Sequence, residues 1–287
     1  MVASAAVIAH SITDHGKTIC TMSLRYWRAI HGELMTHRMF SRNAMSSRAI
    51  PVKKMLKQVW SDPAGPIHWG ANQPGMQANA QLEGWRLWLA RKLWAQAARS
   101  AAFYSWAMMK VGLHKQVANR VTEPYQYMVV LVTATEWENF YALRRHRDAQ
   151  PEMQELANVM FDAQTASKPE RLKNGQWHMP YVSPREHNTY GVLDALKMST
   201  ARCARVSFLN HDQTEPEARK DFKLHDDLVV AEPIHASPTE HAAQAMETPE
   251  NYANFKGWRS YRRCVESGSI IVHGQVRPLD FNRPQKI

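Results

Sequence analysis

The chain has 287 residues, of which 44% are hydrophobic and 22% charged, and its formal net charge is +10. This length suffices for one large domain or two smaller ones, and the composition is that of an ordinary globular protein. No apolar run approaches the roughly 18 residues that span a bilayer, and the start lacks the basic segment of a secretory signal. Its 3 cysteines are scattered, without a Cys-x-x-Cys pair. This excludes a disulfide framework and favours a cytoplasmic protein.

The positive charge predicts an anionic partner. Lys and Arg are spread through the chain rather than gathered in a tail, and no nucleic-acid-binding motif is present. We therefore expect small phosphorylated ligands, no stable nucleic-acid partner and no membrane partner. Neither the histidines nor the carboxylates have metal-ligand spacing, so no metal is expected.

Helical and strand periods alternate along the first half of the chain. Residues 17–27 have a β pattern, helical spacing follows at Trp27, Ile30 and Leu34, and Pro51 opens a short helix. Residues 60–78, rich in Pro, Gly and Asn, read as an irregular loop. Residues 78–112 give the best helical pattern, and its tryptophans are expected in the core or at a subunit interface.

The second half is less regular. Met128–Val132 is a strand or a helix, and Pro151 opens an amphipathic helix. Residues 166–190, with three prolines, read as a loop, and Ala201–Leu209 reads as a strand. Thr214 and Glu217 have the spacing of a capping box, which predicts a helix to about Val229.

The most informative stretch is residues 36–48, which contain three arginines, one histidine, one asparagine and three serines. A second polar segment follows at residues 133–144. Large apolar residues such as Phe40 and Trp137 interrupt both, so neither reads as a solvated face. Guanidinium groups and hydroxyls at this spacing suit phosphate and the edge of a heterocycle. The two segments therefore predict a nucleotide site.

These residues resemble the signature of flavin-dependent thymidylate synthases. The matching signature positions are His37-Arg38, Asn43, Ser46 and Arg48. The second segment is similar to the family's next motif at Asn139, Arg144 and Ala149-Gln150-Pro151-Glu152, and an Arg-x-x-x-Pro segment precedes it at Arg120–Pro124. Together with the two C-terminal motifs described next, they make four family motifs whose order matches that of the family when the chain is read as a circle. Such an agreement is hard to produce by chance.

Two family motifs stand in an unusual place. An Ala-Arg-Val-Ser segment and a His-x-Ser/Thr-Pro-x-Glu-His turn come first in the family but last here, at residues 204–207 and 235–241. The simplest interpretation is a circular permutation within one domain of residues 1–287. Residues 17–165 would then correspond to the family's C-terminal part, 166–190 to the joining loop, and 191–287 to its N-terminal part.

The resemblance implies an α+β fold with an antiparallel sheet flanked by helices, in a homotetramer whose subunits share their sites. It implies that methylenetetrahydrofolate donates one carbon to C5 of dUMP, that reduced FAD supplies the hydride to give dTMP, and that NADPH is the reductant. Arg144 would be the catalytic residue, stabilising charge on the pyrimidine ring. The implied nucleotide-binding residues are Glu33, Thr36, Ser46, Ser47, Arg48, Arg120 and Arg144, and the implied FAD-binding residues are His37, Arg38, Asn43, Thr133, Thr135, Asn139, Ser207, His235 and Ser237.

Several positions depart from the family pattern. Thr36 replaces an arginine, Ala44 a glutamate and Glu33 a glutamine, while Thr133-Ala134-Thr135 replaces Asn-x-Arg. Two guanidinium contacts to the flavin diphosphate are thus missing. Arg42, Arg202 and Arg205 are candidates to replace that charge.

These departures leave alternatives open. One is a divergent flavin-dependent methylase or hydroxymethylase that acts on dUMP or dCMP and makes a modified DNA precursor. A second is a basic nucleic-acid-binding protein that uses arginines and tryptophans. A third is a scaffold without catalytic activity.

Overall fold

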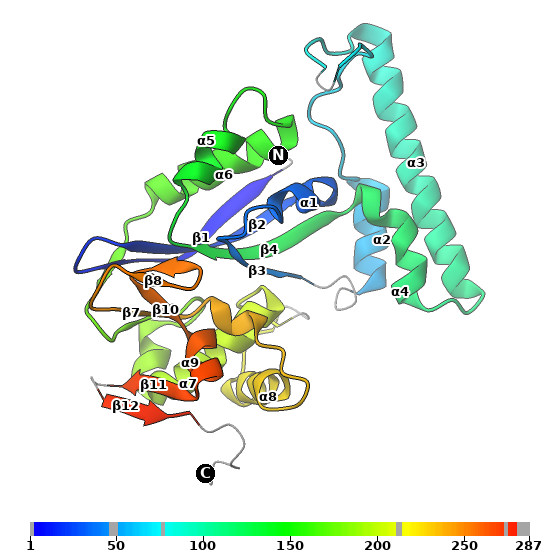
Figure 1. Cartoon of the computed structure of the whole chain (residues 1–287). Helices are drawn as coiled ribbons and strands as arrows, with labels where there is room; N and C mark the ends of the chain where they lie inside the picture. The colour runs from blue at the N-terminus through cyan, green and yellow to red at the C-terminus, as the bar shows by residue number, and fades with distance from the viewer. Residues whose placement is uncertain (1–2, 46–50, 76–77, 211–213, 273–274, 280–287) are drawn as a thin grey trace.

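The computed structural model describes residues 3–45, 51–75, 78–210, 214–272 and 275–279. A five-stranded sheet with strand order β3-β4-β2-β1-β5 organises the chain. All its neighbours are antiparallel except β1 and β5, which are parallel. Its strands are β1 (Ser4–Thr13), β2 (Thr18–Trp27), β3 (Ser41–Ala44), β4 (Tyr127–Ala134) and β5 (Glu170–Leu172). The mixed α+β class is therefore confirmed, with helices on both faces of the sheet (Figure 1).

Alternation along β2 and β4 separates the two faces of this sheet. Cys20, Met22 and Leu24 point to one face, where the helix α6 (Pro151–Ala166) packs with its residues Met153, Leu156, Ala157 and Met160. Thr21 and Thr133 point to the other face, as does Leu131, which packs against the end of α7 (Pro184–Arg205). Because successive side chains of a strand point to opposite faces, these apolar residues of β2 face α6, and the hydroxyls of Thr21 and Thr133 lie on the opposite face of the sheet.

The segment between β3 and β4 forms a projecting arm (Figure 1). It consists of α2 (Val52–Ser61), α3 (Gly84–Lys110), α4 (Lys115–Ala118) and the 3-10 helix η2 (Asn119–Tyr125). Val59, Ala98 and Ala102 hold α2 and α3 together. Short helices η1 (Arg28–Ile30) and α1 (His31–Leu34) follow β2, and α5 (Glu138–Arg144) follows β4.

The C-terminal part builds a second layer beneath the sheet (Figure 1). A three-stranded sheet, in the order β10-β7-β6, lies at its centre. Trp258 and Phe255 are almost completely buried beside Ile19 of β2, which joins this layer to the first. The layer's elements are β6 (Trp177–His178), α8 (Ala218–Val229), η3 (Ser237–Glu240), β7 (Ala243–Ala245), β8 (Asn251–Tyr252), β9 (Phe255–Lys256), β10 (Trp258–Ser260), α9 (Tyr261–Ser267), β11 (Ser269–Val272) and β12 (Gln275–Pro278).

Three local predictions need correction. Ala201–Leu209 is not a strand, because residues through Arg205 continue α7, whose last turns are buried on every side and so lack an amphipathic pattern. Residues 166–190 are more than a loop, since they contain β5, β6 and the start of α7. The helix predicted to reach Val229 is present, but it starts at Ala218 after Glu217, without a side-chain cap from Thr214. Among the described residues, no helix is long and apolar enough to span a membrane.

Candidate active site

Three polar residues, from α1 and the turn after it, meet around the guanidinium group of Arg144. Arg144, the last residue of α5, contacts the carboxylate of Glu33 through Nη1 and donates from Nε to Nε2 of His37 over 2.9 Å. Its Nη2 lies 3.4 Å from Oγ1 of Thr36. We call Glu33, Thr36, His37 and Arg144 the Arg144 cluster. The side chains of Arg144 and Glu33 are 21% and 25% exposed, so this ion pair is only partly shielded from water.

His37 is held as a neutral acceptor. Its Nε2 accepts from Arg144, which places the ring proton on Nδ1. Burial lowers the pKa of His37, and the charges of Arg144 and Arg42 lower it further. The ring packs edge-to-face on Phe140 at a centroid distance of 4.8 Å. A neutral, fixed imidazole and a carboxylate therefore orient a permanent positive charge.

The turn that carries His37 is closed by an arginine. Arg42 of β3 donates from Nη1 to the carbonyl oxygens of Met35 and His37, at 2.8 and 3.2 Å, and more weakly to that of Leu34. These carbonyls belong to the end of α1 and the turn after it, where α-helical bonding stops. The carbonyls of Leu34 and His37 also accept backbone N–H groups, from His37 and Phe40. Arg42 is therefore a structural part of the signature turn, with its guanidinium committed to the backbone.

The C-terminal motif lies against the same strand. η3, which contains Ser237, packs on β3, and Asn43 of β3 lies 3.5 Å from the carbonyl oxygen of Cys203 near the end of α7. Ser207 follows α7 directly and is half-buried, as is Ser237, whereas His235 is exposed. The segments of residues 204–207 and 235–241 thus reach β3, a few positions after His37, despite their distance in the sequence.

A row of buried hydrogen bonds lies beneath the sheet. Thr133 Oγ1 lies 2.7 Å from Thr21 Oγ1 and 2.8 Å from Nδ1 of His241. Thr21 also bonds to Nε2 of His178 at 2.8 Å, and Nδ1 of His178 bonds to Ser11 at 2.9 Å. We call these five residues the buried row. Burial lowers the pKa of both histidines to about 3, so they are neutral. Nε2 of His241 is buried and has no hydrogen-bond partner among the residues described.

This row was not predicted, although Thr133 was expected to bind the flavin. Thr133 has no exposed surface and its hydroxyl is already shared between two partners. Thr135 is also engaged, because its hydroxyl accepts from the backbone N–H of Lys256 at 3.0 Å. The two threonines in place of Asn-x-Arg therefore join β4 to the C-terminal layer. The partners lie more than 100 positions apart, so no local pattern indicates the row.

Other predicted residues lie apart from the Arg144 cluster within one chain. Arg120 precedes β4 and Arg144 follows it, so a strand of 8 residues separates them. Arg120 is exposed and pairs with Glu123 at 2.7 Å. Asn139 is exposed on α5, and Arg38 is exposed in the signature turn. Ser46, Ser47 and Arg48 lie outside the described residues.

Arg202 and Arg205 belong to a buried network of ion pairs. Both are buried, and both bond to the completely buried carboxylate of Asp221, at 2.9 and 2.7 Å. Arg202 also pairs with Glu186 at 2.7 Å. This network ties α7 to α8. The guanidinium of Arg202 is thus occupied by two carboxylates, whereas Nε and Nη2 of Arg205 are buried without a partner among the described residues. Among the described arginines of the signature turn, Arg38 is exposed.

The exposed groups around β3 fit part of a dinucleotide. Arg38 is an exposed positive charge in the turn before β3, and Ser237 lies in η3, which packs on β3. Asn139 and His235 are further exposed donors and acceptors. The buried Nε2 of His241 is a further polar atom close to η3 that lacks a partner among the described residues. These residues are compatible with a flavin, whereas the buried and shared hydroxyl of Thr133 is not available to it.

The fold and this geometry define an α+β protein with an arginine-centred site at the end of a mostly antiparallel sheet. A family model described as thymidylate synthase complementing protein matches residues 10–170, which is more than half of the chain. The chain belongs to this family, that of the flavin-dependent thymidylate synthases, and the resemblance of its motifs is confirmed.

Comparison with solved structures finds a UMP/dUMP methylase, PolB, from Streptomyces cacaoi. In its form bound with 5-Br UMP it is 17% identical, the match covers 57% of this chain and 88% of that chain, and the TM-score is 0.45. In its form bound with 5-Br dUMP the identity is 16%, the coverage 57% and 90%, and the TM-score 0.47. No curated protein matches the sequence.

Proposed function

We propose that this protein is a flavin-dependent thymidylate synthase. It would transfer a one-carbon unit from methylenetetrahydrofolate to C5 of dUMP and give dTMP, with NADPH as the final reductant. Family membership supports the reaction class. The observation that carries the proposal is that Arg144 meets Glu33 and His37 of the signature turn, across more than 100 positions of sequence.

Arg144 has the properties that the reaction requires. C5 of uracil becomes nucleophilic when negative charge builds up on the ring, and a fixed cation beside the ring stabilises that charge. A guanidinium group has five N–H donors, and Arg144 directs only some of them at Glu33, His37 and Thr36. The remaining donors are available to a pyrimidine edge. Because arginine does not deprotonate, its role is electrostatic.

We propose that FAD binds beside this cluster through His37, Arg38, Asn43, Asn139, Ser207, His235 and Ser237. When bound, the reduced flavin supplies the hydride that completes the methyl group. The protein's part is to position the nucleotide and to exclude water. His37 would touch both ligands, since it accepts from Arg144 and lies next to Arg38 in the turn.

The nucleotide phosphate is expected at Ser46, Ser47 and Arg48, with Arg120 as a further contact. Arg120 precedes β4 and Arg144 follows it, and a strand of 8 residues is about 26 Å long at the usual rise per residue. We propose that Arg120 contacts a nucleotide at the Arg144 cluster of a neighbouring subunit, in keeping with shared sites.

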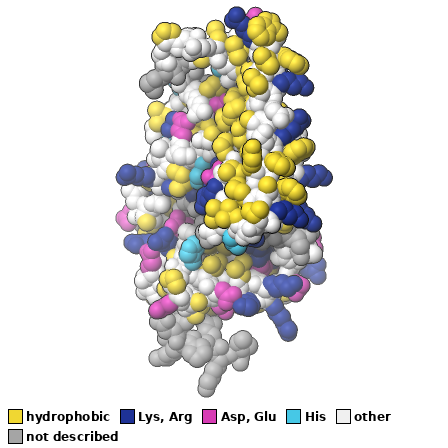
Figure 2. Space-filling model, turned by 90° about the vertical axis from the view of Figure 1, so that its right-hand side faces the viewer, with side chains coloured by type: hydrophobic (Ala, Val, Ile, Leu, Met, Phe, Trp, Pro, Cys, Tyr) yellow, Lys and Arg dark blue, Asp and Glu magenta, His cyan; other side chains and the backbone are white. Residues whose placement is uncertain are grey.

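The outer face of α3 supports a homotetramer. Figure 2 shows a band of hydrophobic side chains along it, with Lys and Arg beside them. Trp85 is 69% exposed and Leu93 61% exposed, and the other large exposed residues of the helix are Trp88, Leu89, Phe103, Tyr104 and Trp106. A band this long and rich in aromatic residues is typical of a protein interface. We propose that other copies of the chain cover it.

The order of the motifs supports a circular permutation within a single domain. The C-terminal segment that contains Ser237 packs on β3, which belongs to the N-terminal half. Asn43 and Cys203 likewise connect the two halves. The permutation would preserve these contacts while changing the position of the chain ends.

The alternative is a divergent methylase or hydroxymethylase that acts on dCMP or dUMP. Glu33 favours it, because a carboxylate beside the guanidinium can accept from the amino group at C4 of cytosine. A cytosine substrate or a hydroxymethyl product would distinguish this alternative from thymidylate synthesis, whereas methylation of dUMP gives dTMP in both cases.

One experiment separates them. The purified protein is incubated with FAD, NADPH, methylenetetrahydrofolate and either dUMP or dCMP, and the nucleotide is weighed by mass spectrometry. Thymidylate synthesis adds one methylene group to dUMP and leaves dCMP unchanged. A methylated or hydroxymethylated cytosine nucleotide, or a net gain of CH2O by dUMP, would establish the alternative, and unchanged nucleotides in the presence of bound flavin would reject both.

A further inference from the structure

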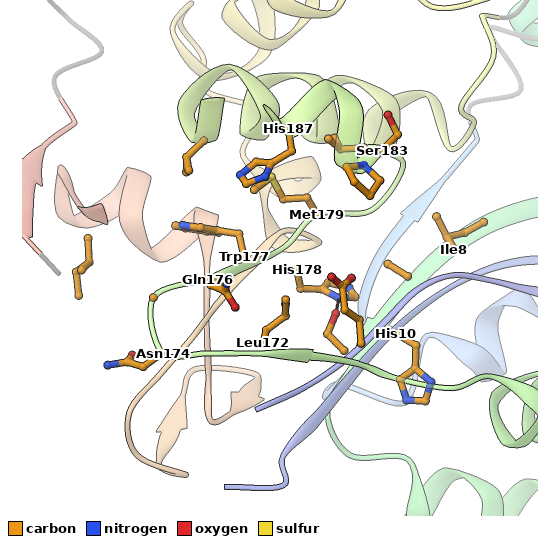
Figure 3. Close-up of a pocket in the computed structure, with 18 residues that line it drawn as sticks. Ile8, His10, Leu172, Asn174, Gln176, Trp177, His178, Met179, Ser183 and His187 are labelled. Atoms are coloured by element: carbon orange, nitrogen blue, oxygen red, sulfur yellow. Dashed lines mark hydrogen bonds between the residues drawn. The ribbon is translucent and has the colours of Figure 1, made fainter. Parts of the chain in front are cut away.

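A cavity apart from the Arg144 cluster lies between the edge of the large sheet and the start of α7. It has a volume of about 530 Å³ and is lined by β1, by the segment of residues 170–179 and by the first turns of α7 (Figure 3). This volume lies within the range typical of small-molecule sites. Of the residues assigned above to the nucleotide or the flavin, none of those that the structure describes lines it.

The wall of this cavity is almost free of charge. Lys and Arg make up 36 of the 287 residues, yet the described residues of the lining include neither. Glu170, which is exposed, is the one acidic residue among them. Burial lowers the pKa of His10 and of His178, so both imidazoles are neutral. A phosphate or carboxylate buried here would lose its hydration without a counter-charge, which is costly.

A metal ion is not a suitable occupant either. His10, His178 and His187 all line the cavity, but both nitrogens of His178 are engaged by Ser11 and Thr21. Nδ1 of His10 lies 3.2 Å from the hydroxyl of Ser167. Among the described residues, no group of three or more His, Cys, Asp or Glu side chains is placed to hold a metal ion.

The apolar part of the lining suits a flat ring. Trp177 and Met179 come from β6 and the residue that follows it, and His187 comes from α7, on one side of the cavity (Figure 3). Leu172 and Ile8 add aliphatic surface. Aromatic rings and thioethers both make favourable contacts with the faces and edges of planar groups.

Polar groups on the lining suit an uncharged polar substituent. Oε1 of Gln176 accepts from the backbone N–H of Lys173 at 2.7 Å, which directs this amide but leaves its two N–H donors available. Asn174 adds a second amide at the rim. At the inner wall, His178 is only 1% exposed and is fixed by hydroxyls on both ring nitrogens, so it cannot swing in to fill the space.

We propose that this cavity is a binding site for an uncharged, planar ring compound that carries an amide-type group. The ring would lie against Trp177 and Met179, and the amide would reach the rim donors. The site is separate from the Arg144 cluster and of opposite character, since it selects against the anionic ligands that the cluster favours.

A matched pair of probes tests this proposal in the unaltered protein. Benzamide and benzoate have the same shape, but benzoate is charged. Protein labelled with 13C in its methionine methyl groups is titrated with each, and the signals of Met179 and of Met35, which is exposed beside the Arg144 cluster, are assigned with Met179→Leu and Met35→Leu. We expect benzamide to shift Met179 but not Met35, and benzoate to bind at least about tenfold more weakly, which corresponds to about 1.4 kcal/mol.

The result that would overturn the proposal is equal affinity for the two probes, or no shift of Met179 by benzamide. An Ala9→Leu variant provides a second check, because Ala9 lines the cavity and a larger side chain reduces its volume. It should weaken benzamide binding severalfold while leaving the visible spectrum of bound flavin unchanged. Unchanged benzamide affinity in this folded variant would place the probe elsewhere and contradict the proposal.

Discussion

The Arg144 cluster and the buried row show two ways in which one chain holds polar groups. In the cluster, the permanently charged side chain of Arg144 is 21% exposed and the carboxylate side chain of Glu33 is 25% exposed. The row consists of hydroxyls and neutral imidazoles with almost no exposure. Exposure allows the cluster to exchange water for a ligand, whereas the row is sealed and fixes β2 and β4 to the C-terminal layer. The first arrangement suits binding and catalysis, and the second suits stability.

Arg144→Ala should have the largest effect, and it should fall on activity. Loss of a donor that stabilises charge in the transition state typically costs about 10²–10³-fold in turnover. We expect a loss of this size in kcat for dTMP formation, with flavin still bound. The measurement is steady-state kinetics beside Arg147→Ala, whose guanidinium is 90% exposed and which should behave as the unaltered protein. An Arg144→Ala enzyme within tenfold of the unaltered rate would remove the residue from the mechanism.

Thr133→Val should act chiefly on stability. The substitution keeps the shape of the side chain but removes the hydroxyl that joins Thr21 to His241. Leaving buried groups without partners costs about 1–3 kcal/mol, so the free energy of unfolding in urea should fall by that amount. A change below about 0.5 kcal/mol, the usual range of surface substitutions, would show that the row does not stabilise the fold.

The same two histidines predict how stability depends on pH. His178 and His241 have a pKa of about 3 when folded, compared with about 6.5 in an unfolded chain. Below about pH 6.5 the two histidines therefore bind protons in the unfolded state but not in the folded state. The free energy of unfolding consequently falls as the pH decreases. We expect a loss of about 1 kcal/mol for each histidine between pH 7 and 5.5.

Urea titrations at these two pH values test the prediction. Stability that is constant, or that increases, between pH 7 and 5.5 would contradict the assignment of two neutral buried histidines.

Thr36→Val should have the smallest effect on stability. It is the counterpart, in the Arg144 cluster, of Thr133→Val in the buried row. Its hydroxyl is exposed and bonds to the backbone of Glu33 at 2.7 Å. A surface substitution of this kind is expected to change the unfolding free energy by less than about 0.5 kcal/mol. A cost as large as that of Thr133→Val would erase the distinction between the two regions.

Local periodicity predicted the helices and strands that have one apolar and one polar side. The strand at residues 17–27, the helix after Pro51 and the helix from Pro151 are all present, because each has one apolar side. The end of α7 was misread as a strand since Arg202 and Arg205 are buried with Asp221, and such a pairing has no periodic signature. β1 was not predicted at all.

In the candidate site, too, some features could be predicted from the local sequence and others depend on distant residues. The motif around His37 and Arg144 indicated their proximity, which the structure confirms. The engagement of Thr133 and Thr135 by distant partners could not be read from the sequence, because it depends on how the C-terminal layer packs beneath the sheet. Only the folded chain shows that Arg42 bonds to the turn's own carbonyls.

The central claim is that a flavin and a pyrimidine nucleotide meet at the Arg144 cluster. The most direct test is the visible absorption spectrum of the purified protein with bound FAD, recorded before and after addition of dUMP. We predict that dUMP shifts the flavin band in the unaltered protein and that Arg144→Ala binds flavin but loses this response. A protein that binds no flavin, or whose flavin spectrum is unchanged at saturating dUMP and dCMP, would contradict the account.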